Sequence, residues 1–243
     1  MITGRPPRAV TIDLDDTVFA QQAYLDGAWR AVAAAAGRRG LPEQALRAAL
    51  TQIAAEGSDR GGIIDRALAR CGVRARPALV ADLVSVFRGF RPAGLPAYPG
   101  VPERLRELRQ HVPVGCITDG DPSIQRAKID ALGLGQAFDT IMVSDEIGRQ
   151  FRKPHAAPFL AALGALGVAP GDAIHIGDRP EKDIAGPHRL GMRAIRVHTG
   201  EYADAADGSP PPDFSFQDAA CALAALRDLV APGDRRGPAE NDD

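Results

Sequence analysis

The sequence predicts an α/β protein, with a three-layer core built on a parallel sheet and an inserted domain made only of helices. Two patterns predict this fold class. Short segments rich in β-branched residues alternate with helical segments from about residue 112 onward, which is typical of a parallel sheet covered by helices on both faces. Before them, a single strand is followed by helical segments alone until about residue 90.

The first expected strand is residues 8–13, which are rich in β-branched side chains and lead into a run of acids. The helices expected next are rich in Ala and Leu and lie at residues 23–36, 42–55, 63–71 and 77–90. A segment rich in Pro and Gly, residues 91–100, ends this helical block.

Strand and helix patterns then alternate. The further strands are expected at residues 112–117, 140–143, 173–176, 194–197 and 214–216. The helices are expected at residues 123–132, 157–166, 182–190 and 219–230. This order is that of a Rossmann-like core, in which ligands bind at the carboxyl ends of the strands.

The same patterns divide the chain into a core and a cap. Residues 1–20 and 94–231 are expected to form the core, and residues 21–93 a helical cap inserted after the first strand. The polar tail, residues 232–243, is expected to be disordered. A cap at this point of the chain is expected to close over the strand ends, which excludes water and large substrates.

Composition excludes several classes of protein. The chain has 243 residues, a net charge of −2 and no basic run, which argues against a nucleic-acid partner. No apolar run approaches the ~20 residues that span a bilayer, and the N-terminus lacks the pattern of a secretory signal. The three cysteines fit neither a disulfide framework nor a zinc site. We expect a cytoplasmic enzyme or binding domain, monomeric or homodimeric, without a membrane partner.

Acidic side chains follow the first strand. Asp13 and Asp15 lie two residues apart where a buried strand ends, and Thr17 comes next but one. Two carboxylates at such a place need a cation or a reaction, because a buried charge without a partner is costly. Mg²⁺ suits oxygen ligands and bridges to phosphate. The alternative is that the Asp-Asp-Thr run only forms a turn or caps a helix.

Thr118 and Lys153 also follow predicted strands. Thr118 directly follows the second predicted strand, and the glycine-containing turn after it exposes backbone amides that can donate to an anion. Lys153 precedes Pro154 and a helix, where its ammonium could lie between a carboxylate and a phosphoryl group. Taken alone, the two residues are better explained as a strand-end turn and a solvated loop lysine.

A further pair of acids follows the fourth strand. Asp178 lies at its tip and could be another metal ligand, and Asp183 lies near the start of the next helix, where it could orient the cluster. Asp183 also suits a first helical turn, whose dipole favours an acid, and the two interpretations are compatible. His155 and His175 are expected to have structural or surface roles.

Together these residues resemble the motifs of a known family. The set comprises Asp13-x-Asp15-x-Thr17, Thr118, Lys153-Pro154, and Gly177-Asp178 with Asp183. In order, spacing and position at strand ends it resembles the haloacid dehalogenase superfamily, and the helical insertion is similar to the subfamily with a small helical cap. The resemblance covers about residues 10–197 of the chain.

The resemblance implies a mechanism. Asp13 would be the nucleophile that attacks a phosphate monoester and forms an aspartyl-phosphate. Asp15 would protonate the leaving alcohol and then activate water for the second step. Lys153 would offset the charge of the nucleophile, and it would bind the phosphate together with Thr118 and Asp119.

The resemblance also implies a Mg²⁺ cofactor. Asp13, Asp178 and the backbone carbonyl of Asp15 would bind the ion, and Asp183 would orient these ligands without binding it. The ion matters because a carboxylate that attacks a dianionic phosphate faces like-charge repulsion.

Asp15 separates phosphate chemistry from dehalogenation, since a halide leaves without a proton. The expected function is a Mg²⁺-dependent phosphatase for a small phosphorylated metabolite. A phosphomutase on a sugar phosphate and a non-catalytic binding module that has kept the fold are the alternatives. The sequence departs from the family pattern at Asp16, which replaces a common Gly, and at residues 148–153, which form a longer loop than usual.

Overall fold

The computed structural model describes residues 2–57 and 60–231, so the tail predicted to be disordered, residues 232–243, lies outside the described residues. The described chain contains a six-stranded sheet in the order β3-β2-β1-β4-β5-β6, and all neighbouring strands are parallel. The strands are β1 (Ala9–Ile12), β2 (Val114–Thr118), β3 (Thr140–Val143), β4 (Ala173–Gly177), β5 (Arg193–Val197) and β6 (Phe214–Phe216). The predicted α/β fold with a parallel sheet is confirmed.

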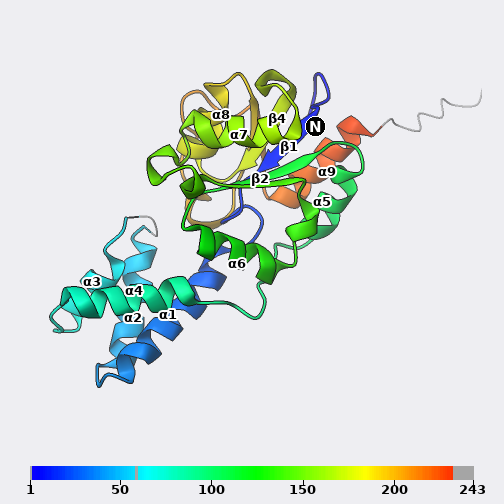
Figure 1. Cartoon of the computed structure of the whole chain (residues 1–243). Coiled ribbons are helices and arrows are strands. Elements are labelled where there is room, and N and C mark those ends of the chain that lie inside the picture. Colours follow the sequence, from blue (N-terminus) through cyan, green and yellow to red (C-terminus); the bar gives the residue numbers. More distant parts are fainter. Residues whose placement is uncertain (1, 58–59, 232–243) are drawn as a thin grey trace, which may run out of the picture. The chain divides into compact units, whose positions relative to one another are not determined.

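Helices cover both faces of this sheet, as Figure 1 shows. α7 (Ala156–Leu166) and α8 (Ala185–His188) pack on one face. α5 (Val101–Arg109) and α9 (Ala219–Val230) pack against each other on the opposite face. Across the described ranges, no helix has both the length and the apolar composition that a membrane crossing requires.

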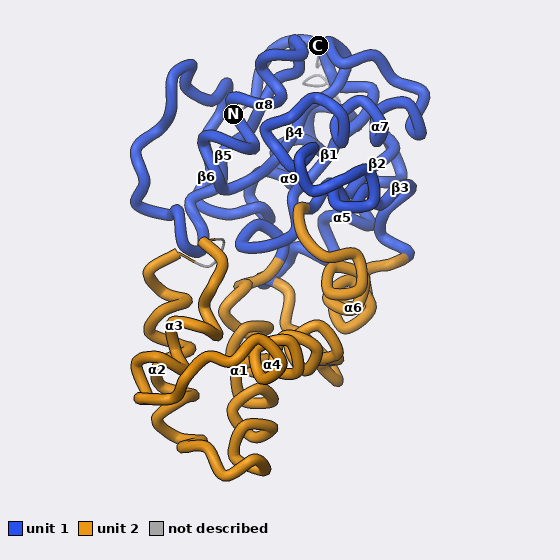
Figure 2. The backbone as a smooth tube through the Cα atoms, turned by 60° about the vertical axis from the view of Figure 1, so that its left-hand side comes forward, with its two compact units in different colours: residues 1–18, 98–118, 136–243 blue, residues 19–97, 119–135 orange. Residues whose placement is uncertain are grey.

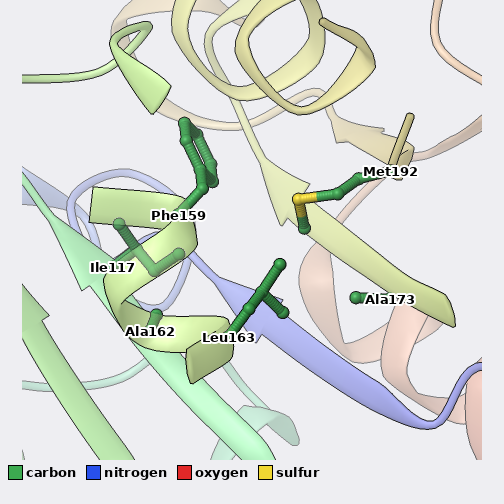
Figure 3. Packing of buried hydrophobic residues seen from close by; sticks show 6 residues of the cluster. All are labelled: Ile117, Phe159, Ala162, Leu163, Ala173 and Met192. Atoms are coloured by element: carbon green, nitrogen blue, oxygen red, sulfur yellow. The ribbon is translucent and has the colours of Figure 1, made fainter. Parts of the chain in front are cut away.

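The packing of α7 fixes the loop that precedes it. Its residues 159, 162 and 163 are three and four positions apart, so their side chains lie on one face of the helix. Figure 3 shows the buried cluster that this face joins: Phe159, Ala162, Leu163, Ile117, Ala173 and Met192. Burial of a large apolar side chain stabilises a fold by about 1.5–3 kcal/mol. The start of α7 is therefore held against β2 and β4.

The described residues divide into two compact units, which Figure 2 colours separately. The first unit contains the sheet and comprises the described residues up to 18, 98–118 and those from 136 onward. The second comprises residues 19–97 and 119–135. Its helices are α1 (Gln21–Gly37), α2 (Glu43–Ala55), α3 (Ile63–Arg70), α4 (Pro77–Gly89) and α6 (Pro122–Leu132). The helices predicted between the first two strands are confirmed.

α5 is a helix that the sequence prediction lacks. Pro and Gly recur from the predicted break at residues 91–100 up to residue 102. Both residue types are also common at the start of a helix. Gly100 takes a left-handed φ of 78° just before the helix, and Pro102 lies in its first turn. Val101, Leu105 and Leu108 then bury one face of the helix.

The helix predicted at residues 182–190 is wrong in its extent. The structure has a π-helical turn, Pro180–Ile184, followed by the short helix α8. Pro187 has no amide hydrogen to donate back to residue 183, so a regular α-helix cannot run through this segment. In addition, the Asp183 carboxylate accepts a hydrogen bond from the Arg179 amide over 3.1 Å, which folds the turn back toward the end of β4.

Candidate active site

Three neighbouring strands of the first unit end in polar side chains. Asp13 follows β1, Thr118 ends β2 and Asp178 follows β4. β1 lies between β2 and β4 in parallel register, so the carboxyl ends of the three strands lie at the same edge of the sheet. The chain leaves β1 toward β2 and β3 on one side and later returns to β4 on the other. Such a switch in direction is where ligands bind in open α/β sheets.

Three carboxylates meet at this edge. Asp13, Asp178 and Asp183 each have an oxygen atom within 4.8 Å of the others, and all three side chains are buried. The buried Thr17 hydroxyl lies between two of them, 3.5 Å from Asp13 Oδ2 and 3.4 Å from Asp178 Oδ1. Thr17 belongs to the sequence motif, and in the structure its hydroxyl links the acids that follow β1 and β4.

Lys153 brings a positive charge into this group. Its side chain is 3% exposed, and its Nζ donates to Asp13 Oδ1, to Asp183 Oδ1 over 2.7 Å and to the carbonyl oxygen of Ile117 over 3.1 Å. The interpretation of Lys153 as a solvated loop lysine is therefore wrong. Its ammonium lies between two of the predicted site acids and the backbone of β2 just before Thr118.

The loop before Lys153 is itself anchored. A short 3₁₀ turn, Arg149–Phe151, precedes it, and the Arg152 guanidinium binds both carboxylate oxygens of Asp145 at 2.6 Å each. Two parallel bonds from a guanidinium fix orientation as well as distance. The longer loop noted in the sequence thus has its own internal support next to the lysine that it carries.

Asp183 is held by donors on both carboxylate oxygens. Oδ2 accepts from the Arg179 amide over 3.1 Å, and Oδ1, which Lys153 already reaches, lies 3.3 Å from His175 Nε2. The other ring nitrogen of His175 lies 2.8 Å from the Thr11 hydroxyl. Next to them, a Cβ atom at Gly177 would overlap the Asp183 side chain, so only glycine allows this close approach.

His175 is thus a residue of the site that sequence reasoning did not assign to it. It is fully buried in the middle of β4 and orients Asp183. A single histidine in an apolar strand gave no signal of this contact, because the contact depends on the turn that brings Asp183 back over β4.

Burial dominates the electrostatics of the group. Burial raises the pKa of Asp13 to about 7, although the neighbouring Lys153 ammonium acts in the opposite direction. Burial also raises the pKa of Asp178 well above its usual range, and the charges of Asp183 and Asp13 add to this effect. Burial acts to raise the pKa of Asp183 too, but there the Lys153 ammonium and His175 outweigh it and hold the pKa below its usual value. Burial lowers the pKa of His175, which favours the neutral ring.

These charges fit a divalent cation. Three carboxylates face one ammonium, and burial, with the charges of neighbouring acids, raises the pKa values of Asp13 and Asp178, so a cation beside them would stabilise their ionised forms. A hard cation prefers oxygen ligands of this kind. Asp183 is the least suited of the three as a ligand, because donors already occupy both of its oxygens.

The remaining predicted residues lie as follows. Asp15 is half-buried, and its charge contributes to the raised pKa of Asp13, which places it near the group. Thr118 is fully buried at the end of β2. Asp119 is half-buried and is the first residue of the second unit after Thr118. The structure therefore brings Asp13, Lys153, Asp178 and Asp183 together.

Residues 7–191 match the family model of haloacid dehalogenase-like hydrolases. The chain belongs to this family. The predicted superfamily is confirmed, and the match extends over the strands that carry Asp13, Thr118 and Asp178 as well as over Lys153 and Asp183.

Curated relatives of this haloacid dehalogenase-like hydrolase are named as phosphatases. A glyceraldehyde 3-phosphate phosphatase from Methanopyrus kandleri is 33% identical over 231 residues, which cover 92% of this chain and 98% of the relative. The enzyme of the same name from Pyrococcus furiosus is 32% identical and covers 81% of this chain and 83% of its own length. A phosphoserine phosphatase from Thermus thermophilus is 36% identical over 47% of this chain and 46% of the relative.

Solved structures share the fold. A 2-haloacid dehalogenase from Pseudomonas syringae is 27% identical with a TM-score of 0.63, and the alignment covers 90% of this chain and 98% of that one. The hydrolase YfnB from Bacillus subtilis has a TM-score of 0.69 at 19% identity, with 93% of this chain and 100% of that one covered. The predicted core with its parallel sheet is thus a recurring fold of the family.

The buried acids predict an unusual pH dependence of stability for this hydrolase. Without metal, we expect the free energy of unfolding to rise as the pH falls from 8 to 6.5. Asp13, with a folded-state pKa of about 7, takes up a proton in this window that the unfolded chain binds only near pH 4, and stability rises as pH falls wherever the folded state binds more protons. The lowered pKa of His175 acts in the opposite direction, because the unfolded histidine takes up a proton around pH 6.5, so it reduces the rise toward the lower end of this window.

Urea unfolding of the metal-free protein at pH 8 and pH 6.5 measures the effect. Saturating Mg²⁺ is the control, because a cation that keeps the carboxylates ionised should remove the dependence. A free energy of unfolding that decreases from pH 8 to pH 6.5 would show that burial of Asp13 does not control its protonation.

Proposed function

We propose that the protein is a Mg²⁺-dependent phosphatase that hydrolyses a small phosphate monoester through an aspartyl-phosphate. The observation that carries the proposal is the convergence of Asp13, Asp178 and the Lys153 ammonium at the edge of the sheet. The names of the relatives support a phosphate monoester as the substrate class.

In the first step, an Asp13 carboxylate oxygen forms a bond to phosphorus and the bond from phosphorus to the alcohol oxygen breaks. Lys153 donates to Asp13, so it holds the carboxylate in one orientation and counters the charge that the phosphate brings. Thr118, Asp119 and Lys153 are proposed to hold the phosphoryl oxygens. In the second step, water attacks the aspartyl-phosphate, which releases inorganic phosphate and restores the Asp13 carboxylate.

Asp15 is proposed to handle the proton in both steps. It gives a proton to the leaving alkoxide and takes one from the attacking water, so the acid returns to its starting state after each turnover. The sequence places it two residues after the nucleophile, and its charge acts on Asp13.

Mg²⁺ would be held by the carboxylates of Asp13 and Asp178 and the backbone carbonyl of Asp15. When bound, it would neutralise negative charge on the phosphate and the carboxylates. Asp183 is proposed to position Lys153 and not to bind the ion, because its oxygens accept from Lys153 and from the Arg179 amide.

We propose that residues 21–93 act as a cap that restricts access to small substrates. Two of the relatives carry the names of small phosphorylated substrates, glyceraldehyde 3-phosphate and phosphoserine, and these are the compounds to assay first. Other sugar phosphates, phosphorylated acids and nucleotides complete the panel.

Release of inorganic phosphate from this panel, with Mg²⁺ and with EDTA, tests the function. We expect turnover that EDTA abolishes and added Mg²⁺ restores. No release from any monoester would favour a binding module, and transfer of a labelled phosphoryl group to another position of a sugar would favour a phosphomutase. Turnover that survives complete removal of metal would reject the Mg²⁺ requirement.

Dehalogenation is a second candidate, because the Pseudomonas syringae relative of known structure is a 2-haloacid dehalogenase. Asp15 argues against it, since a leaving halide needs no proton. Chloride release from a 2-chloro acid, measured beside phosphate release, decides between the two.

The role of Asp15 predicts a dependence on the leaving group. We expect Asp15→Asn to slow hydrolysis of an alkyl phosphate by about 10²–10⁴-fold, the usual contribution of a general acid or base. With p-nitrophenyl phosphate, the first step should be much less affected, because nitrophenolate leaves without a proton. Rapid-mixing measurements should then show a burst of nitrophenolate and slow phosphate release. An equal loss on both substrates, without a burst, would contradict the assignment.

A further inference from the structure

Asp16 has a backbone conformation that residues with side chains rarely adopt. Its φ is 57°, and among the described residues it is the one non-glycine with a positive φ. Asp reaches this left-handed region more readily than most residues, because its short polar side chain can form local hydrogen bonds. The turn at Asp16 joins Asp15 to Thr17, whose hydroxyl lies between Asp13 and Asp178. Its conformation therefore determines the path of the chain past the nucleophile.

A distant segment of the same unit binds this turn. The Thr199 hydroxyl donates to the backbone carbonyl of Asp16, and the Glu201 amide donates to Asp16 Oδ2 over 3.2 Å. Between them, Gly200 has a φ of 66°, and a Cβ atom there would overlap the Cβ and Cγ atoms of Asp16. The backbone carbonyl and the carboxylate of Asp16 are thus both bound by a segment that can approach this closely only because residue 200 is glycine.

A buried arginine anchors the loop that follows. Arg196 of β5 is fully buried, and its Nη2 donates to the carbonyl oxygens of Tyr202 and Ala205 over 2.9 and 2.6 Å. Its Nη1 donates to the Asp207 carboxylate. Because a buried guanidinium is costly unless acceptors meet its donors, these bonds hold the loop in place. The Arg179 guanidinium lies 4.2 Å from the centre of the Tyr202 ring and adds a cation–π contact.

We propose that residues 199–207, which we call the brace loop, bind Asp16 and so position the turn at residues 15–17, which follows the proposed nucleophile Asp13. Arg196 holds the brace loop in place. Asp16 is then a positioning residue. Where the family commonly has glycine, Asp16 provides a carboxylate that the brace loop binds. The inference rests on the proposed role of Asp13 and Asp15 and adds the segment that fixes them. Since the brace loop is not among the residues proposed to hold phosphate, its disruption should lower kcat and leave KM nearly unchanged.

The sharpest test places a methyl group between the two segments. Gly200→Ala should lower kcat on the best monoester by about 100-fold, the loss expected from a displacement of roughly 1 Å in a catalytic group. Gly167→Ala is the matched control, because Gly167 has nearly the same φ, 68°, and no atom within 4 Å of an added Cβ. It carries the same backbone strain without the overlap, so its kcat should equal that of the wild type.

A double-mutant cycle then isolates the contact. In the Asp16→Gly background the atoms that the new methyl group meets are absent, so Gly200→Ala should cost little further kcat there. Equal losses of kcat in the two backgrounds would overturn the proposal, as would wild-type kcat for Gly200→Ala. Urea unfolding of the same four proteins gives a second readout, in which the two substitutions should again be non-additive.

Thr199→Val keeps the proposal testable where Gly200→Ala does not fold. It removes the donor to the Asp16 carbonyl with almost no change in shape, and we expect a lower kcat at an unchanged KM. Full activity of both Thr199→Val and Arg196→Met would reject the brace loop. A wild-type protein that hydrolyses no monoester would instead reject the proposed function, so the two failures are distinct.

Discussion

Asp13→Asn should lower kcat by at least about 10⁴-fold, as expected when a covalent nucleophile is lost. The amide cannot form the aspartyl-phosphate, and the variant should incorporate no acid-labile phosphate from a labelled substrate. The same substitution should raise the thermal midpoint of the metal-free protein at pH 8. It removes one carboxylate from a buried group in which Asp178 and Asp183 repel Asp13, and active sites commonly give up stability in this way.

The two readouts of Asp13→Asn separate two ideas. Equal turnover by the variant and the wild type would remove the assignment of the nucleophile. A lower thermal midpoint at pH 8, together with lost activity, would keep the nucleophile but contradict the electrostatic account of the buried acids. Asp65→Asn is a suitable control, because Asp65 lies on the exposed side of α3 in the second unit.

Lys153→Met should have the largest effect on stability. Its ammonium is buried and binds two buried carboxylates and a carbonyl oxygen, and removal of one partner from a buried ion pair costs about 3–5 kcal/mol. Loss of a charge-stabilising donor should also lower kcat by about 10²–10³-fold. Urea unfolding at pH 8 measures the free energy of unfolding, and phosphate release measures kcat.

Two further variants make the Lys153 prediction specific. Lys182→Met removes a half-buried lysine from the turn that carries Asp183 and should change the free energy of unfolding by less than about 1 kcal/mol. Lys153→Met combined with Asp183→Asn should recover part of the loss, because one of the two buried carboxylates left without the ammonium is then neutral. Loss of the same size in Lys182→Met, or no recovery in the double variant, would contradict this account.

The positions of the site residues along the chain could be predicted because parallel strands impose them. Asp13, Thr118 and Asp178 each end a short apolar strand, and the carboxyl ends of such strands lie together in any sheet of this class. The helices between the first two strands were equally predictable, since Ala-rich and Leu-rich segments with glycine breaks have few other structures open to them.

The sequence predicted Lys153 and Asp183 as site residues, but the way in which each reaches the site could not be predicted, because it depends on irregular backbone. Lys153 enters the site from a loop that Arg152 anchors, and Asp183 reaches it from a π-helical turn. The contact between His175 and Asp183 follows from that turn, and neither residue indicates it alone. α5 was not predicted for a related reason, because Gly100, the last residue of the predicted break, in fact directly precedes the start of this helix.

The strand order has a consequence for how the protein is made. β1 leaves the ribosome first, yet its two neighbours in the sheet are β2, at residues 114–118, and β4, at residues 173–177. Local contacts form fast, and pairings between distant strands form slowly. The helices encoded between β1 and β2 can therefore fold before β1 pairs with β2 and β4. The proposed site of this chain is therefore among the last parts to take shape during synthesis, although Asp13 comes before five of the six strands that the structure describes.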